Sequence, residues 1–178
     1  MTPVNPMDLG FLLLERRNQP MHVGGLILAR PPADAGADYA QRLIADMLQF
    51  KQAEAPFNQR LQRRAGVWCW TQDEDFDREA HVYHLSLPEP GRIRELLALV
   101  SKLHSSLLDR SKPLWEAYVI EGVQDGRIAL YIKVHHALVV GLPAMRPMLR
   151  LSSEDPPAQF IASFTLLALA DRAQPAYP

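Results

Sequence analysis

One stretch organises this chain: RIALYIKVHHALVVG, residues 127–141. Its β-branched and aromatic side chains predict a strand, in which every second residue shares a face. One face is apolar until its last member and consists of Ile128, Leu130, Ile132, Val134 and His136. The other face consists of Arg127, Ala129, Tyr131, Lys133 and His135. The stretch therefore predicts a strand that delivers two adjacent histidines to a turn.

His136 ends the apolar face beside a loop, where an imidazole is well placed to act as a base in a dry pocket. The reference pKa of histidine is near ~6.5, so the neutral form dominates at pH 7, and burial favours that form further. The same position also suits a core histidine that is bonded to a backbone carbonyl. A nucleophile triad and a metal site are further alternatives. We expect no metal, because His135 and His136 point apart and no Cys-x-x-Cys or His-Glu-x-x-His pattern is present.

The composition limits the classes of partner. The 178 residues have the length of one domain, or of one lobe of a larger protein. A net charge of −1, from 19 basic and 20 acidic residues, gives no electrostatic reason to bind nucleic acid. The single Cys69 excludes an internal disulfide and suits a reducing compartment. Because the apolar run 160–170 falls short of the ~20 residues of a spanning helix, we expect a cytoplasmic protein, or one peripheral on a membrane or lipid droplet.

Hydrophobic periodicity and turn residues divide the chain into alternating elements. They predict helices over 5–18, 38–52 and 93–108, and strands over 21–29, 67–70, 115–121 and 127–136. In the first helix, Phe11, Leu12 and Leu14 are expected to point inward. The turn Gln124-Asp125-Gly126 predicts a hairpin. Helices that alternate with strands, together with a hairpin, indicate an α/β domain with a mixed sheet.

Two features of the early chain have competing interpretations. Gly24 and Gly25, inside the strand 21–29, allow the close approach of another backbone or of a ligand. They are equally typical of a β-bulge. His81 and His84 lie in an extended, mixed segment, and we interpret both as structural.

Several motifs, in order, resemble one family. HHALVVG at 135–141 resembles the His-His-x-x-x-Asp-Gly signature of the CoA-dependent acyltransferase superfamily. PMHVGGL at 20–26 and PLWE at 113–116 resemble blocks of the bacterial wax ester synthase/acyl-CoA:diacylglycerol acyltransferase family. Residues 141–152 resemble the segment that follows its histidines. The resemblance covers most of residues 1–155, and we recognise no family counterpart for 160–172.

The resemblance implies the chloramphenicol-acetyltransferase-like fold, a mixed sheet flanked by helices, in which two lobes enclose a tunnel with the active site. Residues 1–155 would form the N-terminal lobe with the His-His motif. Residues 156–178 would form a Pro-rich linker and a short apolar helix. The second lobe would be absent, so a separate lobe or a second copy of the chain is an expected partner.

The implied reaction moves a fatty acyl group from acyl-CoA to a long-chain alcohol or diacylglycerol, which gives wax ester or triacylglycerol. His136 would be the general base, a role worth ~10²–10⁴-fold in rate, and His135 would orient the loop. No cofactor is implied, because acyl-CoA is a substrate. The remaining site residues would be structural (Val140, Gly141, Pro113, Leu114, Trp115) or would border the substrate (Gly24, Gly25).

One position departs from the signature, because Val140 occupies the place of the family's aspartate. That aspartate is thought to brace the motif loop by pairing with an arginine, for which Arg146 and Arg150 are candidates here. Valine can neither accept a hydrogen bond nor carry charge. An arginine left buried without its partner would destabilise the fold.

Two other functions stay open. The chain could be a non-catalytic lobe that binds acyl chains, a lipid-droplet surface or a partner lobe, since an unpaired lobe exposes apolar surface. Acyl transfer by the isolated chain separates this interpretation from the enzyme. Peptide-synthetase condensation domains share the His-His signature, but the 20–26 and 113–116 blocks argue against that class.

Overall fold

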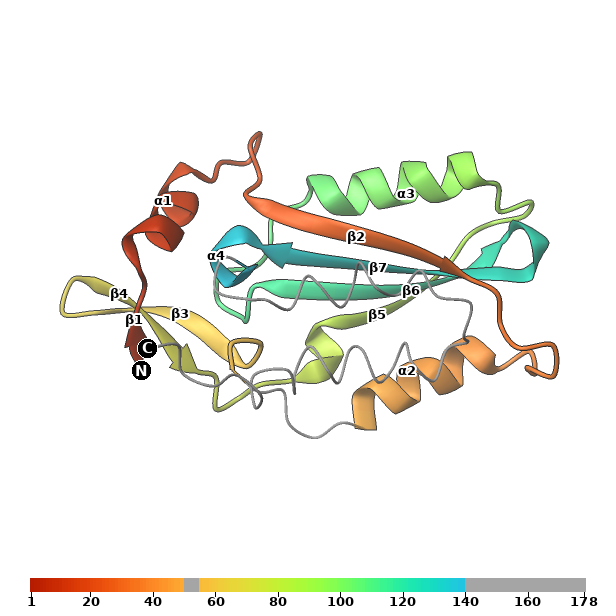
Figure 1. The fold of residues 1–178 in the computed structure, drawn as a ribbon, viewed down its shortest axis with the longest axis horizontal. Coiled ribbons are helices and arrows are strands. Elements are labelled where there is room, and N and C mark those ends of the chain that lie inside the picture. The colour runs from red at the N-terminus through yellow and green to blue at the C-terminus, as the bar shows by residue number, and fades with distance from the viewer. Residues whose placement is uncertain (50–54, 140–178) are drawn as a thin grey trace, which may run out of the picture.

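The computed structural model describes residues 1–49 and 55–139 (Figure 1). Its main sheet has four strands in the order β2-β7-β6-β5. These are β2 (His22–Ala29), β5 (Val82–Ser86), β6 (Trp115–Val123) and β7 (Arg127–His135). β5 runs parallel to β6, whereas β2–β7 and β6–β7 are antiparallel. The mixed sheet that the alternating elements predicted is therefore confirmed.

A second, smaller sheet lies beside the first. It has three antiparallel strands in the order β1-β4-β3, namely β1 (Thr2–Pro3), β3 (Gln59–Arg64) and β4 (Val67–Gln72). The start of the chain is thereby joined to its middle. Side chains of this sheet, including Leu61 and Trp70, belong to the same apolar core as one face of the main sheet.

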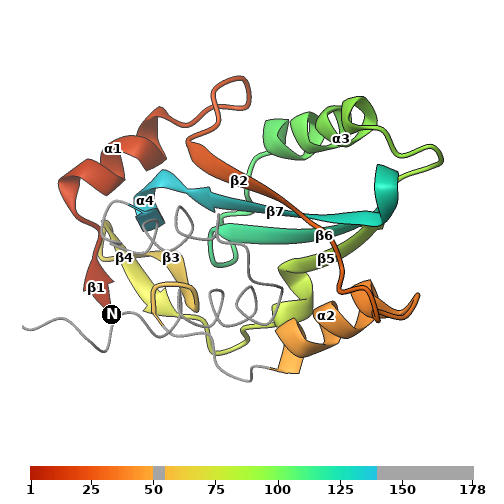
Figure 2. The same ribbon diagram turned by 45° about the vertical axis from the view of Figure 1, so that its right-hand side comes forward.

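The α-helices are α1 (Pro6–Leu14), α2 (Tyr39–Gln49), α3 (Ile93–Ser105) and the short α4 (His136–Val139). The two longest, α2 and α3, cover opposite faces of the main sheet (Figure 2). α3 packs on one face through an apolar cluster that includes Leu96, Tyr118 and Tyr131. α2 packs on the opposite face, where Leu43 and Met47 join the other core. Among the described residues, no helix has the length and hydropathy needed to cross a membrane.

α1 begins as its sequence predicts and ends earlier. The Asn5 side chain accepts the N–H groups of Met7 and Asp8, both at 2.9 Å, and caps the helix. The backbone turns extended at Glu15, with φ −61° and ψ 130°. Leu14 is therefore the last helical residue and is 60% exposed, so the prediction that it points inward is wrong.

The alternation predicted for β7 is confirmed up to His135. Leu130, Ile132 and Val134 lie in the core on the α2 side, while Ala129 and Tyr131 lie in the cluster under α3. The prediction that His136 continues the apolar face is wrong, because it is the first residue of α4. The β2–β7 register ends at His135 and the β6–β7 register ends at Val134, so neither ladder includes His136.

The predicted hairpin between β6 and β7 is present at the other end of the sheet. The turn is Gln124–Gly126, where Asp125 has a φ of 66°. A β-bulge between Ile120 and Val123 shifts the register just before this turn. The bulge and the histidine pair therefore lie at opposite ends of β7 (Figure 1).

Candidate active site

The strands on either side of β7 each hold one histidine by its backbone. Consecutive N–H groups of a strand point to opposite neighbours within a sheet. The His135 N–H donates to the Leu114 carbonyl at 3.0 Å, on the β6 side. The His136 N–H donates to the Met21 carbonyl at 2.8 Å, on the β2 side. The structure thus brings the blocks at 20–26 and 113–116 together with the described part of the third block, 135–139.

The His135 side chain is fully buried and closes the turn into α4. Its Nδ1 accepts the backbone N–H of Ala137 at 3.0 Å. Burial lowers the pKa of His135 to about 4; the charge of Glu15 opposes this effect and that of Arg110 adds to it. The ring is therefore neutral at pH 7. Since a backbone N–H can only donate, the single ring proton lies on Nε2.

The His136 side chain has a different environment from that of its neighbour. It is half-buried and stacks on Phe11 of α1, with ring centroids 4.7 Å apart and an interplanar angle of 13°. The ring therefore has one face against α1 and remains partly accessible. Of the two histidines, only His136 is open to a reactant.

Glu15, which sequence reasoning missed, lies beneath this pair. Its side chain is 2% exposed, and its Oε1 lies 3.4 Å from His135 Nε2. Oε1 accepts the Met21 N–H at 3.1 Å, and Oε2 accepts Arg110 Nη2 at 3.0 Å. Burial raises the pKa of the Glu15 carboxyl, but these hydrogen bonds and the nearby positive charge outweigh it, so the pKa lies below its usual value.

The local sequence conceals the role of Glu15. A carboxylate at a helix end, followed by Arg16 and Arg17, is typical of a solvated surface. Its place shortly before the 20–26 block was the one available signal. Its partner Arg110 lies 95 positions further along the chain, a separation that local periodicity does not address.

The segment Pro113, Leu114 and Trp115 is buried and joins the histidine pair to the rest of the core. Trp115 Nε1 donates to the Phe57 carbonyl at 2.8 Å. The Trp115 carbonyl accepts His81 Nδ1 at 2.8 Å, and their rings stack at 4.6 Å. His81 is thus a core histidine bonded to a backbone carbonyl, which agrees with its interpretation as a structural residue.

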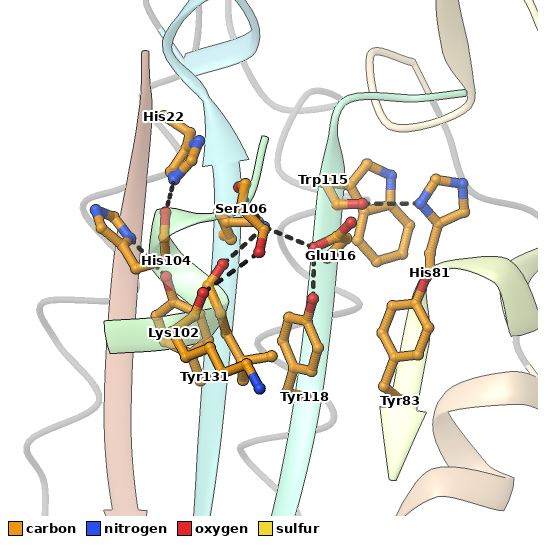
Figure 3. Close-up of polar contacts among 12 residues, drawn as sticks. His22, His81, Tyr83, Lys102, His104, Ser106, Trp115, Glu116, Tyr118 and Tyr131 are labelled. Atoms are coloured by element: carbon orange, nitrogen blue, oxygen red, sulfur yellow. Dashed lines mark hydrogen bonds and ion pairs between the residues drawn. The ribbon is translucent and has the colours of Figure 1, made fainter. Parts of the chain in front are cut away.

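Gly24 lies where side chains from two other elements approach β2. A Cβ at this position would lie 2.6 Å from Tyr131 Oη and 3.1 Å from His104 Nδ1. These two atoms are hydrogen-bonded at 2.6 Å (Figure 3). The nearest atoms to Gly24 are therefore side-chain atoms, whereas the sequence predicted another backbone or a ligand. The β2–β7 register runs unbroken through Gly24 and Gly25, so the β-bulge interpretation is wrong.

A polar cluster beneath α3 continues from this contact (Figure 3). Lys133 is fully buried, with Nζ 2.8 Å from Glu116 Oε2. Nζ also donates to the carbonyls of Leu103 and Ser106, both at 3.1 Å, which end α3. Tyr118 Oη donates to the same Glu116 oxygen at 2.5 Å. Burial, together with the adjacent carboxylate, raises the pKa of Tyr118.

Some predicted site residues lie outside the described residues: Val140, Gly141, Arg146 and Arg150. Within residues 1–49 and 55–139, no group of three or more His, Cys, Asp and Glu side chains is arranged to hold a metal ion.

Known proteins share this arrangement of strands and helices. A solved wax ester synthase/diacylglycerol acyltransferase from Marinobacter aquaeolei VT8 matches 88% of this chain and 38% of that chain, with a TM-score of 0.80 and 52% identity. The epimerization domain of tyrocidine synthetase B matches with a TM-score of 0.60 at 14% identity, which shows a common fold alone. The chain therefore has the chloramphenicol-acetyltransferase-like fold of CoA-dependent acyltransferases that the resemblance implied.

The sequence comparisons narrow this class to one family. A family model described as "Wax ester synthase/diacylglycerol acyltransferase catalytic domain" matches residues 4–176. The O-acyltransferase WSD of Acinetobacter baylyi is 47% identical over 87% of this chain and 33% of its own length. A probable diacyglycerol O-acyltransferase of Mycobacterium tuberculosis, tgs2, is 47% identical over 85% and 34%. The chain belongs to the wax ester synthase/diacylglycerol acyltransferase family.

The matches differ in extent from the expected resemblance. The family model continues to residue 176 and so includes 160–172, for which we recognised no counterpart from the sequence. The chain spans about a third of the length of the curated relatives it matches.

Proposed function

We propose that this chain is the N-terminal, histidine-bearing lobe of an acyltransferase that moves a fatty acyl group from acyl-CoA to a long-chain alcohol or diacylglycerol. The observation that carries the proposal is the unequal placement of the two histidines. His135 is buried and neutral; its Nδ1 accepts the Ala137 N–H, and its Nε2 lies 3.4 Å from Glu15 Oε1, beyond a well-formed hydrogen bond. His136 is held through its backbone and keeps an accessible imidazole.

In the proposed reaction, His136 accepts the hydroxyl proton while the alcohol oxygen attacks the thioester carbonyl carbon. The carbon–sulfur bond then breaks, and the proton passes from His136 to the departing thiolate. The products are the ester and free CoA, and the histidine returns to its neutral form. General base catalysis of this kind contributes ~10²–10⁴-fold. The thioester already activates the acyl group, so the proposal includes no cofactor.

The other residues support this step without taking part in it. His135 shapes the turn by accepting the Ala137 N–H. Leu114 holds the His135 backbone, and Trp115 ties that segment to the core. In this proposal, Gly24 and Gly25 border the substrate path along β2.

The apolar side chains on α1 favour a second candidate, a non-catalytic lobe that binds lipid or another lobe. Met7, Leu13 and Leu14 are 64%, 66% and 60% exposed. Exposed apolar side chains on one helix suit an interface. In either proposal, the partners are a second acyltransferase lobe, a second copy of the chain or a lipid surface, and the protein is cytoplasmic or peripheral on a membrane or lipid droplet.

An assay of free CoA release from acyl-CoA and hexadecanol tests the proposal, with and without a separately supplied C-terminal lobe of a relative. We expect turnover in at least one of these conditions. His136→Ala should abolish nearly all of it, whereas a folded His135→Ala protein should retain more. If His135→Ala is the more damaging change, the assignment of the base is wrong. No turnover in either condition, with binding of the second lobe intact, would establish the non-catalytic candidate.

A further inference from the structure

The Glu15 carboxylate connects four segments of the chain that meet at the histidine pair. It ends α1, accepts the Met21 N–H before β2, accepts the Arg110 guanidinium, and faces the His135 ring at the end of β7. Its side chain is almost fully buried. A buried carboxylate persists only when its oxygens are paired, and here every partner belongs to the surroundings of the two histidines.

We propose that Glu15 is a positioning residue for the His135–His136 pair, which selects the Nε2–H tautomer of His135 and fixes the backbone that carries His136. This inference rests on the proposed acyl transfer for its catalytic consequence. Its structural part stands on geometry alone.

The selection of the tautomer follows from two groups that cannot exchange roles. The Ala137 N–H can only donate, so it requires an unprotonated Nδ1 on His135. An ionised carboxylate can only accept, so it favours a proton on the nitrogen that faces it, Nε2, at 3.4 Å. Glu15 therefore favours the one neutral form of His135 that also closes the turn into α4.

The effect on His136 runs through Met21. Glu15 accepts the Met21 N–H at 3.1 Å, and the Met21 carbonyl accepts the His136 N–H at 2.8 Å. The chain between Glu15 and Met21 is itself closed by a pair of hydrogen bonds between Arg16 and Gln19, at 3.1 and 2.8 Å. A shift of the Glu15 carboxylate therefore moves the acceptor on which the His136 backbone depends.

Arg110 keeps the carboxylate in place. Its Nη2 donates both to Glu15 Oε2 at 3.0 Å and to the Leu12 carbonyl at 2.6 Å, near the end of α1. This guanidinium satisfies the oxygen that does not face the histidine pair. Oε1 is thereby left for Met21 and His135.

The deciding experiment is ¹⁵N NMR of histidine-labelled protein at pH 7, which reads the tautomer of each ring. The signals of His135 are assigned by their absence from His135→Asn, whose side-chain oxygen can still accept the Ala137 N–H. We expect His135 to be in the Nε2–H form. In Glu15→Gln, the Nδ1–H form should become detectable, and the His136 amide should exchange at least ~10-fold faster.

Glu121→Gln is the matched control. Glu121 Oε2 also lies 3.4 Å from a histidine Nε2, that of His84, but both side chains are about one-third exposed. Within the described part of the chain, no hydrogen bond or ion pair joins this pair to Glu15, Met21 or Leu114. Glu121→Gln should therefore leave the ring signals of His135 and the exchange of the His136 amide unchanged.

Two NMR results overturn the proposal. One is a Glu15→Gln protein in which the His135 tautomer and the His136 amide match those of the unchanged chain. The other is an unchanged chain whose His135 carries its proton on Nδ1 at pH 7, a measurement that decides the matter even if Glu15→Gln fails to fold.

Turnover separates this inference from the proposed function. If the unchanged protein is active, Glu15→Gln should lower kcat by about 10–100-fold with little change in KM, as expected for a misplaced base. An unaltered kcat would overturn the inference. If the unchanged protein has no activity while the tautomer responds to Glu15→Gln, the positioning role stands and the proposed function fails.

Discussion

The two faces of β7 are both buried, yet they are packed by different chemistry. On the α2 side, Leu130, Ile132 and Val134 belong to a large apolar core. On the α3 side, Tyr131, Lys133 and His135 are at most 2% exposed, and each has a polar contact with a named partner. The stability of an apolar face depends on the total volume of its side chains, so it tolerates apolar substitutions of similar size. The stability of a buried polar face depends on matched partners, because the loss of one partner leaves the other buried without compensation.

The largest expected effect comes from breaking the central pair of the polar face. Among the described residues, Glu116→Leu leaves the fully buried Lys133 with two backbone carbonyls as partners. We expect a loss of ~3–5 kcal/mol in the free energy of unfolding, measured by urea denaturation. The double variant Glu116→Leu/Lys133→Met should regain much of this loss. If the double variant is as unstable as the single one, the pairing does not govern this face.

A matched change on the apolar face should cost slightly less. Ile132→Ala removes a side chain that lies in the core on the α2 side. The lost burial and the remaining cavity should lower the free energy of unfolding by ~2–4 kcal/mol. Urea denaturation at pH 7 measures it, and no second substitution on this face should restore the loss as pairwise replacement does on the other. A loss below ~1 kcal/mol would mean that this face is loosely packed.

Acid should weaken the polar face selectively. The pKa of His135 is lowered to about 4 by burial, against an ordinary value near 6.5. The unfolded chain therefore binds more protons between these values, and stability, fully present above pH ~6.5, is lost as the pH falls toward 4. His135 alone should contribute about 2–3 kcal/mol to this loss. Burial lowers the pKa of His22 and His81 in the same direction.

Denaturation at pH 7 and at about pH 4.5 measures this effect. In His135→Asn the fall between the two pH values should be smaller, because one of the titrating groups is gone. An equal fall in both proteins would show that His135 is not among the groups that take up protons on unfolding.

The smallest expected effect on stability comes from filling the space beside a glycine, and we compare Gly24 with Gly10. Gly24→Ala places a methyl group 2.6 Å from Tyr131 Oη and should cost ~1–2 kcal/mol. Gly10→Ala is the control, because a Cβ there meets no atom of residues 1–49 and 55–139 within 4 Å. In the interior of α1, that change should stabilise by ~0.5–1 kcal/mol. Thermal melts compare the two, and a stable Gly24→Ala protein would show that Tyr131 moves aside freely.

The faces of β7 were predictable because the period of two is a local property of the sequence. The end of the strand was not, since it depends on where β2 and β6 begin rather than on the residues 135–136 themselves. The capped start of α1 was likewise readable from Asn5 and Pro6.

The motifs located the candidate site, and the contacts between them came only from the structure. Glu15 was missed because its partners lie far along the chain, with Arg110 at a separation of 95 residues. The pairing of Thr2 and Pro3 with Trp70 and Cys69 was missed for the same reason. In the sequence Glu15 resembles a surface carboxylate, but tertiary packing buries its side chain next to His135.

The β-bulge between Ile120 and Val123 has a consequence for how insertions and deletions are tolerated. A residue inserted within β7 would move Val134 into the place that faces Glu15, and His135 into the accessible place of His136. An insertion in the turn 124–126 falls beyond the bulge, where the two strands already contribute unequal numbers of residues. Insertions and deletions in the turn 124–126 should therefore be tolerated. Those within β7 should be eliminated by selection, whatever residues they introduce.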